Sequence, residues 1–415
     1  MLTRSKLVIA LSAAIWIVPM TRAVAGIDVT AGDWKLDFSG NVNAFYVDTN
    51  CDTGTNNSVT GGLACTGDKS AAVRNGLLPA AFVFSATTRQ DNLDIGVTIG
   101  MYPGINSSAA QGVNGAGQPS ALATPGIDAR QAFLTFGDAS WGTVKMGRDL
   151  GLFGKDAILD DMTLLGVGSS TNNAAPGNTS LGRIGLGYIY TDWEPQITYT
   201  TPTFSGFSAS AGVFQPLDSG LYIKHTSPQF QIGGSYAWGG TGGGLSGKVW
   251  VDYVTQQLQA PSGTAGTTGT GSTIAGSFTG NGVDGGVKIG IAGFEGVVYG
   301  YSGTGLGTTG LFILATSALG NTRDSDGGYV QASYKFDRLK VGLSYGMSEL
   351  KQASDERALP ATDLLKRNSS VVGGLYYSLT KSLTLVGEYI HTKADAWNGN
   401  SATERDVAVG AILFF

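Results

Sequence analysis

The chain has 415 residues, with 31 acidic and 26 basic side chains and a formal net charge of −5. Hydrophobic residues make up 42 % and charged residues only 14 %, whereas about a quarter of the residues in a typical soluble domain are charged. The 64 glycines argue against a mostly helical fold, because each glycine inside a helix costs about 1 kcal/mol relative to alanine.

Low charge, abundant glycine and the lack of a long apolar run favour a transmembrane β-barrel, whose strands present an apolar face to lipid in alternation. Beyond residue 25, no stretch of the sequence approaches the roughly 18 apolar residues that mark a membrane helix. A large secreted β-sandwich or β-helix is also compatible with the composition alone.

The first 25 residues have the three parts of a secretory signal peptide. Arg4 and Lys6 form a basic start, residues 7–20 form an apolar core too short for a membrane helix, and Ala23-Val24-Ala25 is a small-residue cleavage site. The segment carries three basic residues and no acidic one, so its removal leaves 23 basic and 31 acidic residues, a net charge of −8. This balance disfavours nucleic acid as a partner, since nucleic-acid binding needs clustered basic residues. We expect residues 26–415 to form one domain.

Cys51 and Cys65 lie 14 residues apart in a polar stretch rich in Gly and Asn. In an exported protein, two cysteines at this spacing indicate one disulfide that closes a loop, worth about 3 kcal/mol in the chain-entropy model. No cluster of Cys or His lies nearby in the sequence to complete a zinc site, so a metal-binding role is disfavoured.

Alternation of apolar side chains with polar or small ones is clearest in the last third of the chain. Residues 327–336 and 339–348 each place apolar side chains at every second position. Successive side chains of a strand point to opposite faces, so each segment predicts a strand with one apolar face. In a barrel, that face contacts lipid and the other face lines the lumen.

Sixteen such segments follow one another and predict an all-β fold, a sixteen-stranded antiparallel transmembrane β-barrel. The connections alternate between turns of one to five residues and much longer loops, as in barrels with short periplasmic turns and long outside loops. An even number of strands places both termini on the periplasmic side. The predicted strands are 33–47, 77–89, 91–102, 126–136, 141–148, 184–201, 205–215, 229–238, 244–257, 282–291, 294–302, 327–336, 338–350, 368–379, 382–393 and 403–415.

The connection over residues 149–183 is too long for a turn, and loops longer than about 15 residues in a compact domain are usually functional. We expect this loop, the third on the outside, to fold into the pore and narrow it. Opposed acidic and basic groups across a narrow water column would then bias which ions enter. Residues 149–182 carry a net charge of −3, from Asp149, Lys155, Asp156, Asp160 and Asp161.

Two further features carry a resemblance to a known family. The last strand ends on Phe415 after apolar residues at alternate positions, as Gram-negative outer-membrane proteins commonly do. The segment IDARQAFLTFGDASWGTVKMGRD at 127–149 resembles the fourth and fifth strands of the general trimeric porins of Gram-negative bacteria. With the signal peptide, the sixteen strands and the long third loop, the resemblance covers the layout of the whole mature chain.

In that family, an acidic third loop faces a ladder of arginines on the opposite wall. Two departures bear on the shape and selectivity of such a constriction here. The loop lacks a Pro-Glu-Phe triplet, and the strand at 77–89 lacks the usual basic residue unless Arg74 or Arg89 replaces it. The resemblance implies a homotrimer in outer-membrane lipid and lipopolysaccharide, with no cofactor and no metal. It implies a pore constriction formed by Asp156, Asp160 and Asp161 against Arg130, Arg148 and Arg183.

We therefore predict an outer-membrane porin with a water-filled pore for passive diffusion of ions and small hydrophilic solutes, weakly selective for cations. A channel selective for sugars or organic acids is the alternative within transport. A non-conducting adhesin or structural barrel, with loops 48–76 and 258–281 as its binding surface, is the alternative from another class.

Enzymatic and metal-binding functions have weaker signals. His225 and His391 are the only histidines, and neither has a clear serine partner on the predicted strand map, so we do not expect an enzyme. The acidic run at 321–328 lacks the twelfth-position Glu of a calcium loop and predicts a turn instead.

Overall fold

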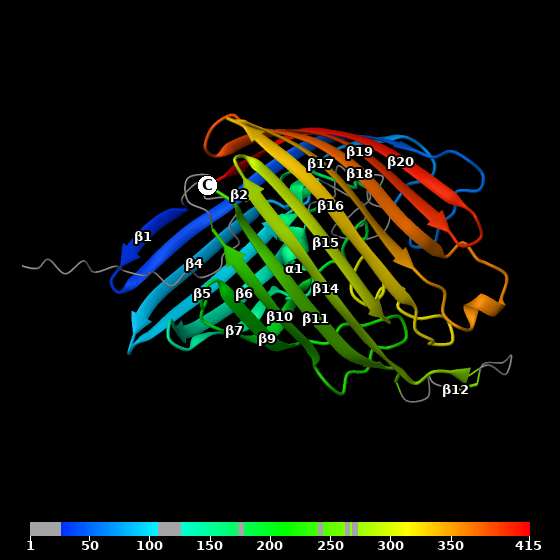
Figure 1. Cartoon of the computed structure of the whole chain (residues 1–415), viewed down its shortest axis with the longest axis horizontal. Coiled ribbons are helices and arrows are strands. Elements are labelled where there is room, and N and C mark those ends of the chain that lie inside the picture. The colour runs from blue at the N-terminus through cyan, green and yellow to red at the C-terminus, as the bar shows by residue number, and fades with distance from the viewer. Residues whose placement is uncertain are drawn as a thin grey trace, which may run out of the picture.

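The structure is a computed structural model that describes residues 26–106, 126–171, 173, 178–239, 244–261, 266–267 and 273–415. The predicted signal peptide at 1–25 lies outside the described residues, as do most of the loop at 103–125 and part of the loop at 258–281. Sixteen long antiparallel strands close into a barrel (Figure 1). Among the described residues, no helix is long and apolar enough to cross a membrane.

The predicted number of wall strands and their antiparallel order are confirmed. Each wall strand pairs with the next one along the chain, and β2 pairs with β20 to close the barrel. The wall strands are β2 (Trp34–Cys51), β4 (Ala81–Gln90), β5 (Leu93–Pro103), β6 (Ile127–Asp138), β7 (Gly142–Leu150), β8 (Trp193–Thr200), β9 (Phe207–Phe214), β10 (Gln229–Trp238), β11 (Ser246–Gln259), β14 (Ser277–Ile291), β15 (Phe294–Thr304), β16 (Asp324–Phe336), β17 (Leu339–Leu350), β18 (Leu365–Ser378), β19 (Leu383–Ala396) and β20 (Ser401–Phe414).

Most predicted strands differ from the observed bounds by a few residues, and one strand differs by more. The strand predicted at 184–201 begins only at Trp193, and residues 184–192 belong to the preceding loop. Gly185 and Asp192 have φ angles of 72° and 58°, in the left-handed region that a strand does not use. The apparent alternation in this stretch therefore comes from a buried, irregular segment.

Short strands complete the sheet around β2. The strand β1 (Ile27–Ala31) pairs with the first half of β2, and β20 pairs with the second half on the same side. Gly40 and Phe415 exchange two backbone hydrogen bonds where β20 ends. The strand β3 (Ser70–Arg74) pairs with the far end of β2 beyond β4. A remaining pair, β12 (Gly266–Thr267) with β13 (Thr273–Ile274), lies in the long β11–β14 connection.

The wall strands alternate as their sequences predict. Leu343 and Val409 are 61 % and 57 % exposed on the outer face, whereas their neighbours Ser344 and Ala408 are 1 % exposed. Large apolar side chains exposed along a closed sheet match the lipid-facing band of a membrane barrel.

The segment between β7 and β8 lies against the inner face of the wall. It contains α1 (Lys155–Asp160) and the 3-10 helix η3 (Met162–Leu165). Its backbone N–H groups donate to buried side chains of the wall: that of Gly154 to Asp284 on β14 at 2.6 Å, and that of Met162 to Gln331 on β16 at 3.0 Å. Those of Val167 and Gly168 both donate to Glu388 on β19.

Glycine on the inner face of β17 leaves room for this close approach. A Cβ atom added to Gly346 would lie 2.2 Å from the carbonyl oxygen of Leu186, and one added to Gly342 would meet the end of the Met162 side chain. The segment therefore sits directly on the backbone of the wall at these points.

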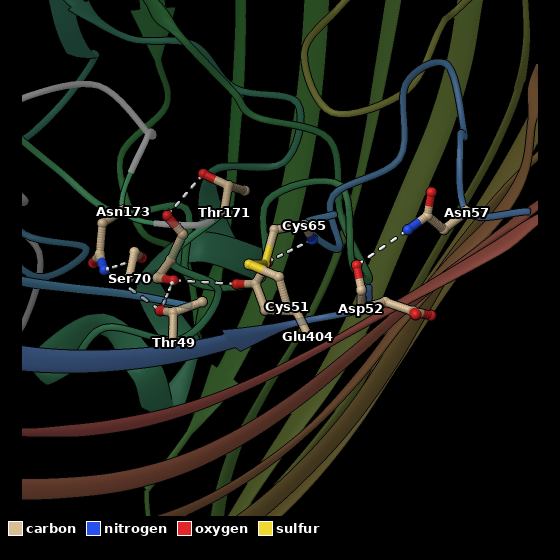
Figure 2. Close-up of a disulfide and its surroundings, with 10 residues drawn as sticks. Thr49, Cys51, Asp52, Asn57, Cys65, Ser70, Thr171, Asn173 and Glu404 are labelled. Atoms are coloured by element: carbon tan, nitrogen blue, oxygen red, sulfur yellow. Dashed lines mark hydrogen bonds between the residues drawn. A yellow bond between two sulfur atoms is a disulfide. The ribbon is translucent and has the colours of Figure 1, made fainter. Parts of the chain in front are cut away.

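A disulfide and a buried carboxyl group connect separate parts of the chain at the end of the barrel that carries the long loops. Cys51 and Cys65 form a disulfide with a Cα–Cα distance of 5.1 Å. Beside it, Glu404 of β20 accepts hydrogen bonds from the Cys65 N–H at 2.8 Å and from the Ser170 hydroxyl at 3.1 Å (Figure 2). One buried carboxyl group thus links the first long loop to the segment between β7 and β8.

Replacement of Gly346 by Ala tests the close approach. We expect a loss of about 1–3 kcal/mol in the free energy of unfolding, because the new methyl group meets a backbone oxygen that has no rotamer to change. Gly373→Ala on β18 is the matched control, since a Cβ there meets nothing within 4 Å. Guanidinium unfolding of the folded barrel measures both, and equal midpoints would contradict the placement of Leu186.

Replacement of both Cys51 and Cys65 by Ser tests the disulfide. The first long loop should then be cleaved faster by protease between residues 52 and 64, because the closed loop loses about 3 kcal/mol of chain-entropy stabilisation. The hydrogen bonds of Glu404 do not involve sulfur, so the pore itself should stay open. A loss of conductance in this variant would show that the disulfide also holds the pore.

Candidate functional site

A cavity of about 2360 Å³ runs through one side of the barrel. Its walls come from the inner faces of β2, β4–β11, β14 and β15, and from α1. The inner faces of β16–β19 contribute nothing to this lining. Two buried apolar clusters border that side. Tyr188 and Ile189 of the loop belong to one with Tyr329 of β16. Met162 and Val167 belong to the other with Val372 of β18 and Ile390 of β19.

The acidic residues of α1 pair with lysines of the wall. Asp156 pairs with Lys248 on β11, and Asp160 accepts a hydrogen bond from Lys288 on β14 at 2.9 Å. The two lysines lie directly opposite each other in the β11–β14 ladder. Residues four apart on a helix share a face, so α1 presents both carboxylates to this lysine pair.

The lysine pair continues into a wider ionic network on the wall. Lys288 also contacts Glu295 on β15 at 3.0 Å, and Glu295 contacts Lys340 on β17 at 3.5 Å. Burial raises the pKa of Asp160, and the charge of Lys288 offsets part of that rise. The two carboxylates of α1 line the cavity as partners of wall lysines, so each negative charge is partly offset by a cation.

Two of the predicted constriction residues lie away from the cavity. Asp161 is 3 % exposed and accepts hydrogen bonds from the Thr163 N–H and the Tyr188 hydroxyl, both at 2.9 Å. Arg183 is fully buried and donates to the carbonyl oxygens of Ser344 at 2.6 Å and Ser370 at 3.2 Å. These two residues connect the loop to itself and to β17 and β18.

Burial changes the ionisation of both groups. It raises the pKa of the Asp161 carboxyl, against the opposing effect of Arg183 and of the hydrogen bonds from Thr163 and Tyr188. It also lowers the pKa of the Arg183 guanidinium, and Asp161 partly restores it. Asp161 and Arg183 therefore stabilise each other's charge inside the packed part of the loop.

The other two predicted arginines line the cavity. Arg130 is the extra residue of a β-bulge in β6, and bulges re-aim side chains. It donates to Asp128 at 3.1 Å, and its guanidinium lies 5.5 Å from the Tyr102 ring. Arg148 is exposed at the end of β7. Lys145, also in the lining, pairs with Asp149.

Sequence reasoning missed the lysines that face α1. Lys248 and Lys288 occupy inward positions of their strands, which the alternation of apolar and polar residues could have indicated.

Sequence reasoning also missed a second inward segment, residues 305–323 between β15 and β16. The Tyr190 N–H of the first segment donates to the carbonyl oxygen of Thr309 at 2.8 Å. Within the described part of the chain, no group of three or more His, Cys, Asp or Glu residues could hold a metal ion.

Comparisons with known proteins agree with this architecture. A family model described as Gram-negative porin matches residues 10–396. A search of curated protein sequences found no match. The outer membrane channel DcaP of Acinetobacter baumannii is 15 % identical, with a TM-score of 0.67 over 94 % of this chain and 100 % of DcaP.

Two more solved structures illustrate the range of similar barrels. OmpF of Salmonella typhi, solved in complex with daunomycin, is 15 % identical, with a TM-score of 0.55 over 94 % of this chain and 100 % of OmpF. OmpT of Vibrio cholerae in its trimer form is 13 % identical, with a TM-score of 0.52 over 92 % of this chain and 99 % of OmpT. At such identities the likeness shows the fold. Because the family model matches most of its length, the chain belongs to the Gram-negative porin family and has the fold of an outer-membrane channel.

Proposed function

We propose that this porin conducts ions and small hydrophilic solutes by passive diffusion, with a weak preference for cations. The observation that carries the proposal is the cavity that runs beside α1. Its lining contains eleven acidic and eight basic side chains, an excess of negative charge. Charges at a low-dielectric wall act more strongly than charges in bulk water, so this excess raises the local cation concentration.

In this proposal α1 sets the narrowest part of the pore. The lysine pair of β11 and β14 holds α1 by its two carboxylates, and Asp161 and Arg183 position the rest of the segment without touching solute. Size exclusion then comes from the loop, whereas charge preference comes from Asp156 and Asp160 with Arg130, Arg148 and Lys145 in the same lining. No step of this mechanism needs a cofactor or a covalent intermediate.

The remaining parts of the proposal concern location and assembly. Residues 1–25 serve as a cleaved signal peptide, and the mature barrel lies in the outer membrane in contact with lipid and lipopolysaccharide. A homotrimer is supported by the trimer form of the similar OmpT.

Conductance of the refolded mature protein in a planar bilayer tests the proposed function. We expect current steps grouped in threes and, under a salt gradient, a modest reversal potential of the sign that marks cation selectivity. Anion selectivity would overturn the charge account and leave the pore in place. A protein that folds but passes no current would overturn the porin proposal and favour an adhesin or structural barrel.

The double substitution Asp156→Asn with Asp160→Asn tests the role of the α1 carboxylates. The first change frees Lys248 and the second leaves Lys288 paired with Glu295 alone, so the reversal potential should move toward anion selectivity. Asp218→Asn is the control, because Asp218 is exposed beside His225 in an outside loop and does not line the cavity. An unchanged reversal potential in the double variant would remove α1 from the narrowest part of the pore.

A further inference from the structure

The second inward segment presents one large apolar side chain to the cavity. Within the run Leu311–Ala315, Leu311, Phe312 and Ala315 are 5 %, 1 % and 1 % exposed. Ile313, in the middle of the run, is 52 % exposed and lines the cavity. A single exposed aliphatic side chain needs no explanation, whereas a contiguous apolar patch marks an interaction site, so the surroundings of Ile313 decide its meaning.

The backbone around Ile313 is strained. Thr309, Phe312 and Leu314 have φ angles of 67°, 65° and 59°, and non-glycine residues in this region cost about 1–3 kcal/mol each. Buried hydrogen bonds hold the conformation: the Ser219 hydroxyl donates to the Phe312 carbonyl at 2.7 Å, and the Thr308 N–H donates to the Ile313 carbonyl at 2.9 Å. Strain of this kind persists where the surroundings over-determine the conformation, and it clusters at functional sites.

Ile313 belongs to a larger apolar surface inside the cavity. Four side chains of the first inward segment line the same cavity and pack on the apolar cluster that also contains Phe312. The hydrogen bond from Tyr190 to Thr309 joins the two segments. We call this surface the apolar shelf, made of Leu159, Leu164, Leu181, Tyr190 and Ile313.

We propose that the apolar shelf binds the apolar body of organic cations as they pass through the pore. This inference rests on the proposed function and names a solute class for it, amines that carry an aromatic or branched aliphatic group. The acidic excess of the lining favours the cationic end, and the shelf removes part of the apolar end from water. Small inorganic ions have no apolar surface and pass the shelf without contact.

Block of the K⁺ current by benzylammonium, compared with methylammonium at the same concentration, tests the proposal. We expect benzylammonium to block and methylammonium to have little effect. Ile313→Ser should weaken the block by about fivefold while leaving the K⁺ conductance unchanged, because partial burial of an aliphatic side chain contributes on the order of 1 kcal/mol. Ile313→Val should weaken it by less than about twofold, since one methylene is lost.

Ile223→Ser is the matched control. Ile223 is 54 % exposed in an outside loop and does not line the cavity, so this variant should keep the wild-type block. Equal block by the two amines, or equal block in wild type and Ile313→Ser, would overturn the apolar shelf while the K⁺ current still supports the porin. Absence of any K⁺ current in the wild type would overturn the proposed function and this inference with it.

Discussion

The described backbone of residues 151–171 and 178–192 runs inside the barrel, where its amide groups cannot all reach water. Its need for hydrogen-bond partners shapes the rest of the structure. The wall supplies those partners as side chains rather than as a neighbouring strand. Gln231, Asp284, Gln331 and Glu388 come from four different strands, and each accepts hydrogen bonds from backbone N–H groups of this segment. Many polar side chains on the inner face of the wall therefore bind the backbone of this segment.

This constraint places the pore off centre. Because the segment packs against β16–β19 with two apolar clusters, the wall strands that line the cavity are those from β2 to β15 and the end of β20. The ionic network of α1 lies at the border between the packed side and the open side. Surface ion pairs stabilise little, but the partly buried pairs of Lys248 and Lys288 fix the position of a helix that has only six residues. The same four charges thus hold the loop and face the solute.

The barrel could be predicted from the sequence because the signal that defines it is local. Alternation along each strand determines which residues face lipid, and the lengths of the connections determine the hairpins. The stretch at 184–192 shows the limit of this approach. Its alternating glycines and aromatic residues imitate a strand, but left-handed backbone angles and burial on all sides place it in the loop.

The charges of the site were harder to predict, since their roles depend on long-range pairing. Asp160 and Asp161 are neighbours in sequence, yet Asp160 meets Lys288 on the wall, whereas Asp161 follows the end of α1 and turns into the buried cluster. Arg183 similarly looked like a pore residue because it ends an acidic loop. Its partners are carbonyl oxygens more than 150 positions later in the chain, which no local pattern indicates.

The apolar shelf is compatible with passive diffusion because its contribution is small. If a bound solute covers the exposed half of Ile313 and parts of its neighbours, the gain is on the order of 1–2 kcal/mol, which corresponds to a residence only about five- to thirtyfold longer than that of a solute with no apolar surface. Such a weak site slows no other ion when the solute is dilute. It does raise the local concentration of amphiphilic cations at the pore, and the strained backbone that exposes Ile313 is the structural cost of that bias.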